Sequence, residues 1–170
     1  NMKLSVLAVI LLTLGFITNV APAQAADASI ICSFSYDELD AATDMKTFSN
    51  KLEALGFSRE GRVTNANYSK STPDYIYHAE KPFAKKNSIT VIKTLFNPTA
   101  LNWKDTPFAA DIKSIKDRYC ATANASPKSH CNDTEKTFNL SLSYVRTPPL
   151  SNCNLLVGYA DGQLKITYMH

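Results

Sequence analysis

Four cysteines carry the most distinctive chemistry of this chain: Cys32, Cys120, Cys131 and Cys153. An even number of cysteines in an exported chain predicts disulfide bonds, and four cysteines allow three pairings. We favour Cys120–Cys131, which brackets a short polar loop after a predicted helix, together with Cys32–Cys153, which ties the N-terminal segment to the last strands. Closing that long loop is expected to stabilise the fold by about 4 kcal/mol.

A metal site is the alternative interpretation of some of these residues. His130 and Cys131 are adjacent, but the spacing of cysteines and histidines matches no zinc motif, and an oxidising compartment disfavours free thiolates. Asp37, Glu38 and Asp40 form an acidic run that lacks the spacing and the glycine of a calcium loop. We therefore predict no metal and no cofactor, and we expect the acidic run to be a polar turn that leads into a helix.

His78 and Glu80 are the best candidates for an enzymatic pair. They lie two residues apart on a predicted strand, so both side chains point to the same face. A carboxylate beside a histidine can orient the imidazole as a general base. The common serine-nucleophile, zinc-protease and phosphate-loop motifs are absent from the sequence. The alternative is an exposed pair on a solvated sheet face, and we predict no catalytic residue.

Aromatic rings close to lysines form a candidate binding site. Its residues are Tyr68, Tyr75, Tyr77, Lys85, Lys86 and Trp103. The rings fall in or beside predicted loops and edge-like strands. Tyrosine and tryptophan are favoured at protein interfaces because they are large, fairly rigid and able to hydrogen-bond. The hypothesis is a protein-facing patch, and the alternative is that the rings fill the core.

The strands that close the chain are the clearest of the elements that must position these residues. Alternating apolar and polar side chains predict strands over 138–146, 153–159 and 164–168. The pair Asp161-Gly162 favours a tight hairpin turn between the last two. One apolar and one small polar face is typical of an antiparallel sheet with one solvated side.

Two amphipathic helices are predicted earlier in the chain. The first runs over 45–55, with Thr43 or Asp44 as its N-cap and Gly56 as a left-handed C-terminal residue. The second begins at Thr106-Pro107 and ends at Cys120.

Further strands are predicted over 29–36, 75–80 and 89–96, with a short one near 62–68. Lys93 is an odd member of an apolar strand face, so we expect it near a sheet edge or reaching out to solvent. The element order predicts a single α+β domain, with two helices packed on one face of a curved antiparallel sheet. A helix followed by strands occurs twice, which suggests a duplicated unit, although no residue-level repeat supports it.

The first 25 residues are typical of a secretory signal peptide. Met2-Lys3 is a basic start, residues 4–16 are mostly apolar, and Ala23-Gln24-Ala25 fits a small-residue cleavage site. The apolar run is short for a membrane span of about 20 residues, so we expect cleavage rather than anchoring. Residues 26–170 then form the α+β domain, in a periplasmic or secreted location.

These observations favour a protein that works through its surface. The formal net charge of +3 is too small to indicate nucleic acid or an anionic membrane as partner. We expect a small exported protein-binding module, for example an inhibitor or immunity protein, rather than an enzyme. The alternatives are a hydrolase with an unfamiliar site at His78 and Glu80, and an envelope structural or ligand-carrier protein with an apolar cavity between helices and sheet.

Overall fold

The computed structural model describes residues 31–82, 87–99, 101–145 and 152–170, so the predicted signal peptide, Lys85 and Lys86 lie outside the described residues. The helices and strands in chain order are β1 (Ser35–Tyr36), β2 (Leu39–Asp40), α2 (Met45–Ala54), β3 (Ser58–Glu60), β4 (Asn67–Ser71), β5 (Tyr75–Glu80), β6 (Ser88–Leu95), α3 (Ala109–Asn124), β7 (His130–Asp133), β8 (Phe138–Tyr144), β9 (Cys153–Ala160) and β10 (Gln163–Met169). Short 3-10 turns cover Val63–Asn65 and Trp103–Asp105.

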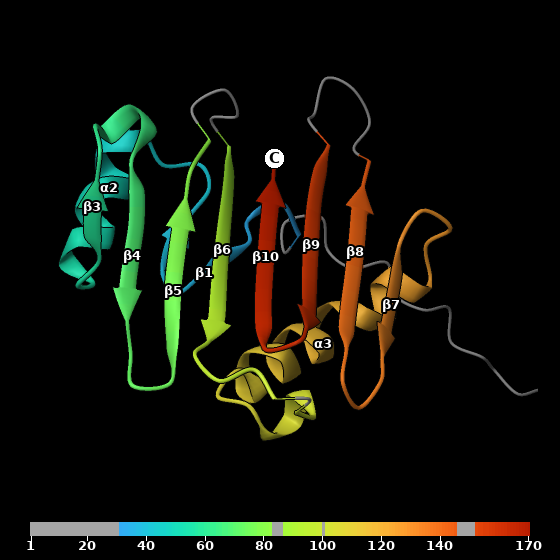
Figure 1. The fold of residues 1–170 in the computed structure, drawn as a ribbon. Helices are drawn as coiled ribbons and strands as arrows, with labels where there is room; N and C mark the ends of the chain where they lie inside the picture. The colour runs from blue at the N-terminus through green and yellow to red at the C-terminus, as the bar shows by residue number, and fades with distance from the viewer. Residues whose placement is uncertain (1–30, 83–86, 100, 146–151) are drawn as a thin grey trace, which may run out of the picture.

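One antiparallel sheet of eight strands forms the body, in the order β3-β4-β5-β6-β10-β9-β8-β7, while β1 and β2 pair with each other in a separate hairpin. Both helices lie behind this sheet in Figure 1, α2 at the β3 end and α3 at the β7 end. Among the residues that the structure describes, no helix lies on the front of the sheet. The predicted α+β class, with two helices on one face of an antiparallel sheet, is therefore confirmed.

The sheet consists of two meanders that meet in its centre. Helix α2 precedes β3 to β6, and helix α3 precedes β7 to β10. The meanders join where β6 pairs with β10, with Val91 opposite Ile166. The repeated order of a helix followed by four strands is a similarity of topology, and no residue-level repeat accompanies it.

The core lies between the sheet and the two helices. In β9 the buried residues are Cys153, Leu155, Val157 and Tyr159, and the residues between them are more exposed, as the alternation predicts. Asp44 caps α2 by accepting hydrogen bonds from the N–H groups of Lys46 and Thr47. Hydrogen bonds from Thr47, including its hydroxyl, lower the pKa of Asp44.

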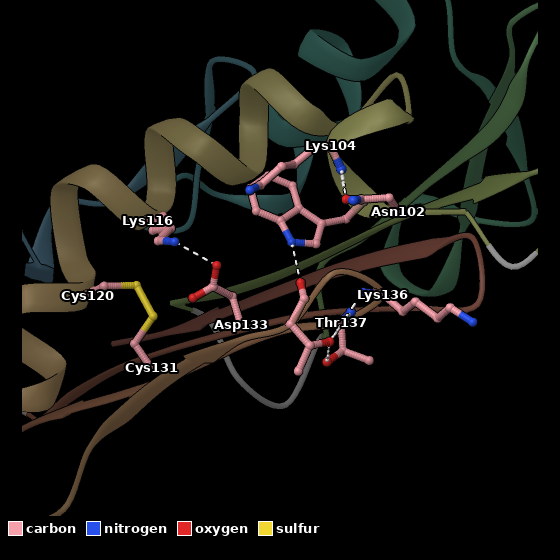
Figure 2. A network of polar contacts seen from close by, with 10 residues as sticks. Asn102, Lys104, Lys116, Cys120, Cys131, Asp133, Lys136 and Thr137 are labelled. Carbon is pink, nitrogen blue, oxygen red and sulfur yellow. Dashed lines mark hydrogen bonds and ion pairs between the residues drawn. A yellow bond between two sulfur atoms is a disulfide. The ribbon is translucent and has the colours of Figure 1, made fainter.

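Both predicted disulfides are present. Cys32–Cys153 joins the N-terminal segment to β9, and Cys120–Cys131 joins α3 to β7. In Figure 2 an ion pair between Lys116 and Asp133, at 2.6 Å, lies beside the second disulfide and links the same helix and strand. Cysteine pairing therefore fixes the N-terminal segment and α3 to the second meander.

The N-terminal segment differs from the prediction. Ile31 and Cys32 are helical, and the strand predicted over 29–36 is reduced to Ser35–Tyr36 among the described residues. The acidic run forms a polar turn, as predicted, but this turn leads into β2, and α2 begins only at Met45. Asp37 and Glu38 have φ of 48° and 64° and form the turn between β1 and β2, where Tyr36 pairs with Leu39. Hairpin pairing buries Tyr36 and Leu39, which the helix interpretation did not take into account.

Two short edge strands were not predicted correctly. The single strand expected near 62–68 is replaced by β3 and β4, and the loop expected before the last sheet contains β7. Helix α3 continues beyond Cys120 to Asn124, whose side-chain oxygen accepts a hydrogen bond from the N–H of Cys131. Strands of three and four residues offer too few alternations for a period of two to be recognised.

Candidate functional site

The side of the eight-stranded sheet opposite α2 and α3, which we call the open face, is a candidate surface for binding. The strand registers align its side chains in rows across the sheet. One row runs through Ser69, His78, Ile92, Lys165, Gly158 and Asn139. The next row runs through Glu80, Thr90, Thr167, Leu156 and Ser141, and Asn67 lines the same hollow as Glu80 and Thr90. Half of these twelve residues are serine, threonine or asparagine, which have short polar side chains.

Two hollows of similar size lie on the open face. The first, of about 350 Å³, is over β3 to β6 and is lined by Glu60, Asn67, Ser69, His78, Glu80, Thr90 and Ile92, among others. The second, of about 360 Å³, is over β7 to β10 and is lined by His130, Asn139, Ser141, Leu156, Gly158, Lys165 and Thr167, among others. The sheet surface is therefore not flat, and each meander contributes one hollow.

His78 and Glu80 both line the first hollow, and both are exposed. They project from the same face of β5, as predicted, because they are two residues apart. Within the described part of the chain, no hydrogen bond or ion pair connects them with each other or with a third side chain. Both side chains are therefore open to a ligand or to solvent in the first hollow.

The rings of the predicted aromatic patch point away from this surface. Tyr68, Tyr77 and Trp103 are only 1%, 6% and 3% exposed, and Tyr75 is half-buried. The indole N–H of Trp103 donates a hydrogen bond to the carbonyl of Thr134 at 2.9 Å. These rings fill the core, which was the alternative interpretation. The three tyrosines occupy the helix-facing phase of β4 and β5, and Trp103 is buried from the 3-10 turn before α3.

Lys93 is the clearest departure from expectation on the helix-facing side. It was expected near an edge or reaching to solvent, but β6 lies in the middle of the sheet and the Lys93 side chain is only 8% exposed. Its ammonium is 3.3 Å from the carboxylate of Asp37 and 3.1 Å from that of Asp111. It also lies 5.0 Å and 4.8 Å from the ring centres of Tyr36 and Tyr77. We call these five residues the Lys93 cluster.

The electrostatics of the Lys93 cluster favour a structural role. The hydroxyl of Tyr36 donates a 2.5 Å hydrogen bond to Asp111. Burial, together with the Asp111 carboxylate, raises the pKa of Tyr36. Burial and the nearby charge of Asp37 raise the pKa of Tyr77. The hydrogen bond from Tyr36 to Asp111 and the ion pairs of Lys93 together hold the β1–β2 hairpin and α3 against the sheet.

Lys70 on β4 and Lys81, directly after β5, also point to the helix side of the sheet. Lys70 donates to the carbonyl of Leu55 at 2.8 Å. Lys81 is buried, and its ammonium donates to the carbonyls of Ala41 and Ser88, while burial lowers its pKa. The open face of the first meander is therefore left without any of the lysines that its strands carry.

Neither metal alternative finds support in this geometry. Cys131 is bonded to Cys120 and is not a thiolate, and Asp37 is engaged with Lys93. Among the described residues, no three histidine, cysteine, aspartate or glutamate side chains gather as metal ligands. In the same part of the chain, no helix has the length and apolarity needed to cross a membrane.

Comparison with known proteins gives no further guide to function. No family model, curated protein or solved structure matches this chain. The candidate site therefore rests on the geometry of the open face alone. Its polar half-faces on β8 and β10 follow from sequence alternation. The partners of Lys93 had no sequence signal beyond a charge in an apolar strand.

Proposed function

We propose that this protein is a small binding module that recognises another protein through its open face. The observation that carries the proposal is a helix-free sheet face with two hollows, each lined by side chains that can donate or accept hydrogen bonds. Loops carry many binding sites, but a sheet face is more rigid, and rigidity reduces the entropy lost on association.

The size of the face suits a specific complex. Eight strands at a spacing of about 4.8 Å span roughly 34 Å, and the strands of seven or eight residues are about 25 Å long, so the face is close to the roughly 800 Å² that each partner contributes to a standard interface. The mixture of short polar residues with Leu156, which is 42% exposed, resembles a non-obligate interface in its polarity.

We also propose that the protein acts after export, in the periplasm or outside the cell. Two disulfides support an oxidising location. In such a compartment, a rigid stapled domain that occupies the cleft of an enzyme would act as an inhibitor or immunity protein.

A steric block of the open face tests the proposal. Gly158 lies in the second hollow, and a Cβ there would meet only the Asn139 side-chain oxygen at 3.9 Å, so Gly158→Arg should fold and obstruct the surface. Ser69→Arg obstructs the first hollow, and Ala121→Arg, exposed on α3, is the matched control.

Immobilised wild type is expected to retain a protein from extracts of the producing organism's envelope and culture medium. Gly158→Arg and Ser69→Arg should each lose it, and Ala121→Arg should keep it. Retention that is indifferent to all three substitutions, or no retained protein in either extract, contradicts the proposal.

A hydrolase is the second candidate, favoured by the hollow of about 350 Å³ around His78 and Glu80. If the pair acts in catalysis, purified protein should hydrolyse members of a panel of p-nitrophenyl esters, and His78→Gln should abolish that turnover while leaving the fold unchanged. The ligand-carrier alternative has no comparable support, since Phe48 packs on Tyr68 and Phe108 on Tyr159 between helices and sheet.

A further inference from the structure

We infer that the open face is electrically polarised, and that it fits a partner protein which presents a cationic group over β3 to β5 and an anionic group over β10. This inference rests on the proposed function and specifies the chemistry of the partner. It is carried by the direction in which each charged side chain of the sheet points.

In the described strands of the first meander, β3 to β6, the formal charges on the open face are carboxylates only. Glu60 and Glu80 are both exposed and line the first hollow. Glu60 is on β3 and Glu80 on β5, on either side of the β4 residue Asn67. The basic residues of the described strands β3 to β6 lie on the helix side, where Arg59 pairs with Glu53, and Lys70 and Lys93 bind the groups described above.

The second meander has the opposite character. Lys165 on β10 is exposed and lines the second hollow, and His130 on β7 lines the same hollow. In the described strands β7 to β10, the only carboxylate is Asp133, and it points to the helix side to pair with Lys116. Over the described strands, the open face thus changes from two negative charges to one positive charge across the β6–β10 junction.

Charges of this kind act mainly on the encounter between proteins. Exposed pairs contribute about 1 kcal/mol or less each to affinity. Complementary charge patterns instead raise the association rate, exclude partners of the wrong pattern and set the orientation of the complex. The polarised face therefore predicts a partner that docks in one orientation, with a basic side chain over the first hollow.

The face is polar rather than apolar in composition, which favours a different protein over a second copy of this chain as its partner. Interfaces in permanent homodimers are more apolar than ordinary protein surface, whereas the two central rows hold Thr90, Thr167, Ser141 and Asn139. We therefore expect the isolated protein to be monomeric in analytical ultracentrifugation. A wild-type dimer that Gly158→Arg dissociates would make the second copy the occupant and overturn the inference.

The polarisation can be measured without any partner. A cationic and an anionic nitroxide of the same size are added to the protein in turn, and the paramagnetic relaxation that each causes at the backbone amides is compared. The cationic probe should relax the amides of Ser69 and His78 more strongly than the anionic probe does, and the order should reverse at Gly158 and Lys165. If the ratio of the relaxation caused by the cationic probe to that caused by the anionic probe is the same over both meanders, the inference is overturned.

Charge reversal tests complementarity with the protein that wild type retains. The variants are Glu60→Lys/Glu80→Lys and Lys165→Glu; the matched controls are Asp105→Lys/Asp117→Lys and Lys113→Glu, exposed outside the eight-stranded sheet. Each open-face reversal should lower the association rate constant about tenfold at 50 mM salt, and the loss should shrink at 500 mM salt. The controls should stay within twofold of wild type.

The possible failures are distinguishable. If Gly158→Arg and Ser69→Arg abolish binding while both reversals bind like wild type, the open face is the binding site but the charge inference is wrong. If the steric variants bind normally, the proposed function itself fails.

Discussion

At the scale of single residues, Lys93 is a buried cation that forms ion pairs with two elements outside the sheet. Its ammonium is shared by two carboxylates, one from the β1–β2 turn and one from α3. Removing one member of a buried ion pair costs about 3–5 kcal/mol, because the remaining charges lose their partner. Here the cost is smaller, since Asp37 and Asp111 are 40% and 32% exposed and water can solvate them.

Lys93→Met should therefore lower the free energy of unfolding by about 1–3 kcal/mol. Methionine preserves most of the side-chain volume, so the change reports the lost charge rather than a cavity. Urea denaturation followed by circular dichroism measures it. The control is Lys113→Met, which breaks the exposed pair with Asp117 and should change stability by less than about 0.5 kcal/mol. Equal losses in the two variants would contradict the role given to Lys93.

The phenols beside Lys93 predict sensitivity to alkaline pH. Burial and neighbouring carboxylates raise the pKa of Tyr36 and Tyr77 in the folded protein, whereas an unfolded tyrosine titrates near pH 10. The folded state then holds more protons above about pH 10, so the free energy of unfolding should fall as the pH rises through that value.

Replacing Tyr36 and Tyr77 with phenylalanine should flatten this pH dependence, measured as the difference in unfolding free energy between pH 8 and pH 11. Tyr144→Phe, half-buried at the end of β8, serves as the control and should keep the wild-type slope. A double variant whose slope matches wild type would show that other groups govern the alkaline response.

At the scale of elements, the two disulfides should contribute unequally. The Cys32–Cys153 bridge spans 121 residues and the Cys120–Cys131 bridge spans 11. On the chain-entropy estimate, these loops correspond to about 5 and about 3 kcal/mol. Cys32→Ala/Cys153→Ala should therefore destabilise by about 2 kcal/mol more than Cys120→Ala/Cys131→Ala in urea denaturation. The reverse order would mean that native-state contacts, rather than loop closure, determine the effect.

The elements with strong local signals were predictable. Asp161 and Gly162 have φ of 49° and 80° and form the predicted turn between β9 and β10. A Cβ at Gly162 would also come within 2.8 Å of Pro98, so space and backbone both require glycine there. Asp44 and Gly56 bound α2 as predicted, because capping depends on neighbouring residues alone.

The candidate site was less predictable, because it depends on which strands become neighbours. Alternation places His78 and Lys165 each on one face of its own strand. It does not reveal that β6 pairs with β10, which is what brings the two half-faces together as one surface. The direction of Lys93 was mispredicted for the same reason, since Asp37 and Asp111 reach it from distant parts of the chain.

At the scale of the whole molecule, the β6–β10 junction should make the two meanders unfold together. Ile166 is 1% exposed and pairs with Val91 across the junction, so Ile166→Ala should cost about 2–4 kcal/mol. Fluorescence of Trp103, the single tryptophan, and far-UV circular dichroism should still give coincident transitions. Lys165→Ala, exposed on the same strand, should change stability by less than about 0.5 kcal/mol. Two separated transitions in the Ile166 variant would show that the meanders are independent units.

The central place of β10 has a consequence for how the chain matures. Among the eight strands of the sheet, β10 comes last in the chain, yet it lies between β6 and β9. A chain emerging from N- to C-terminus therefore carries a bare hydrogen-bonding edge on β6 until α3 and four more strands have followed. Such edges recruit other chains. Newly made molecules should consequently need protection from aggregation by holding chaperones until their final strand is released.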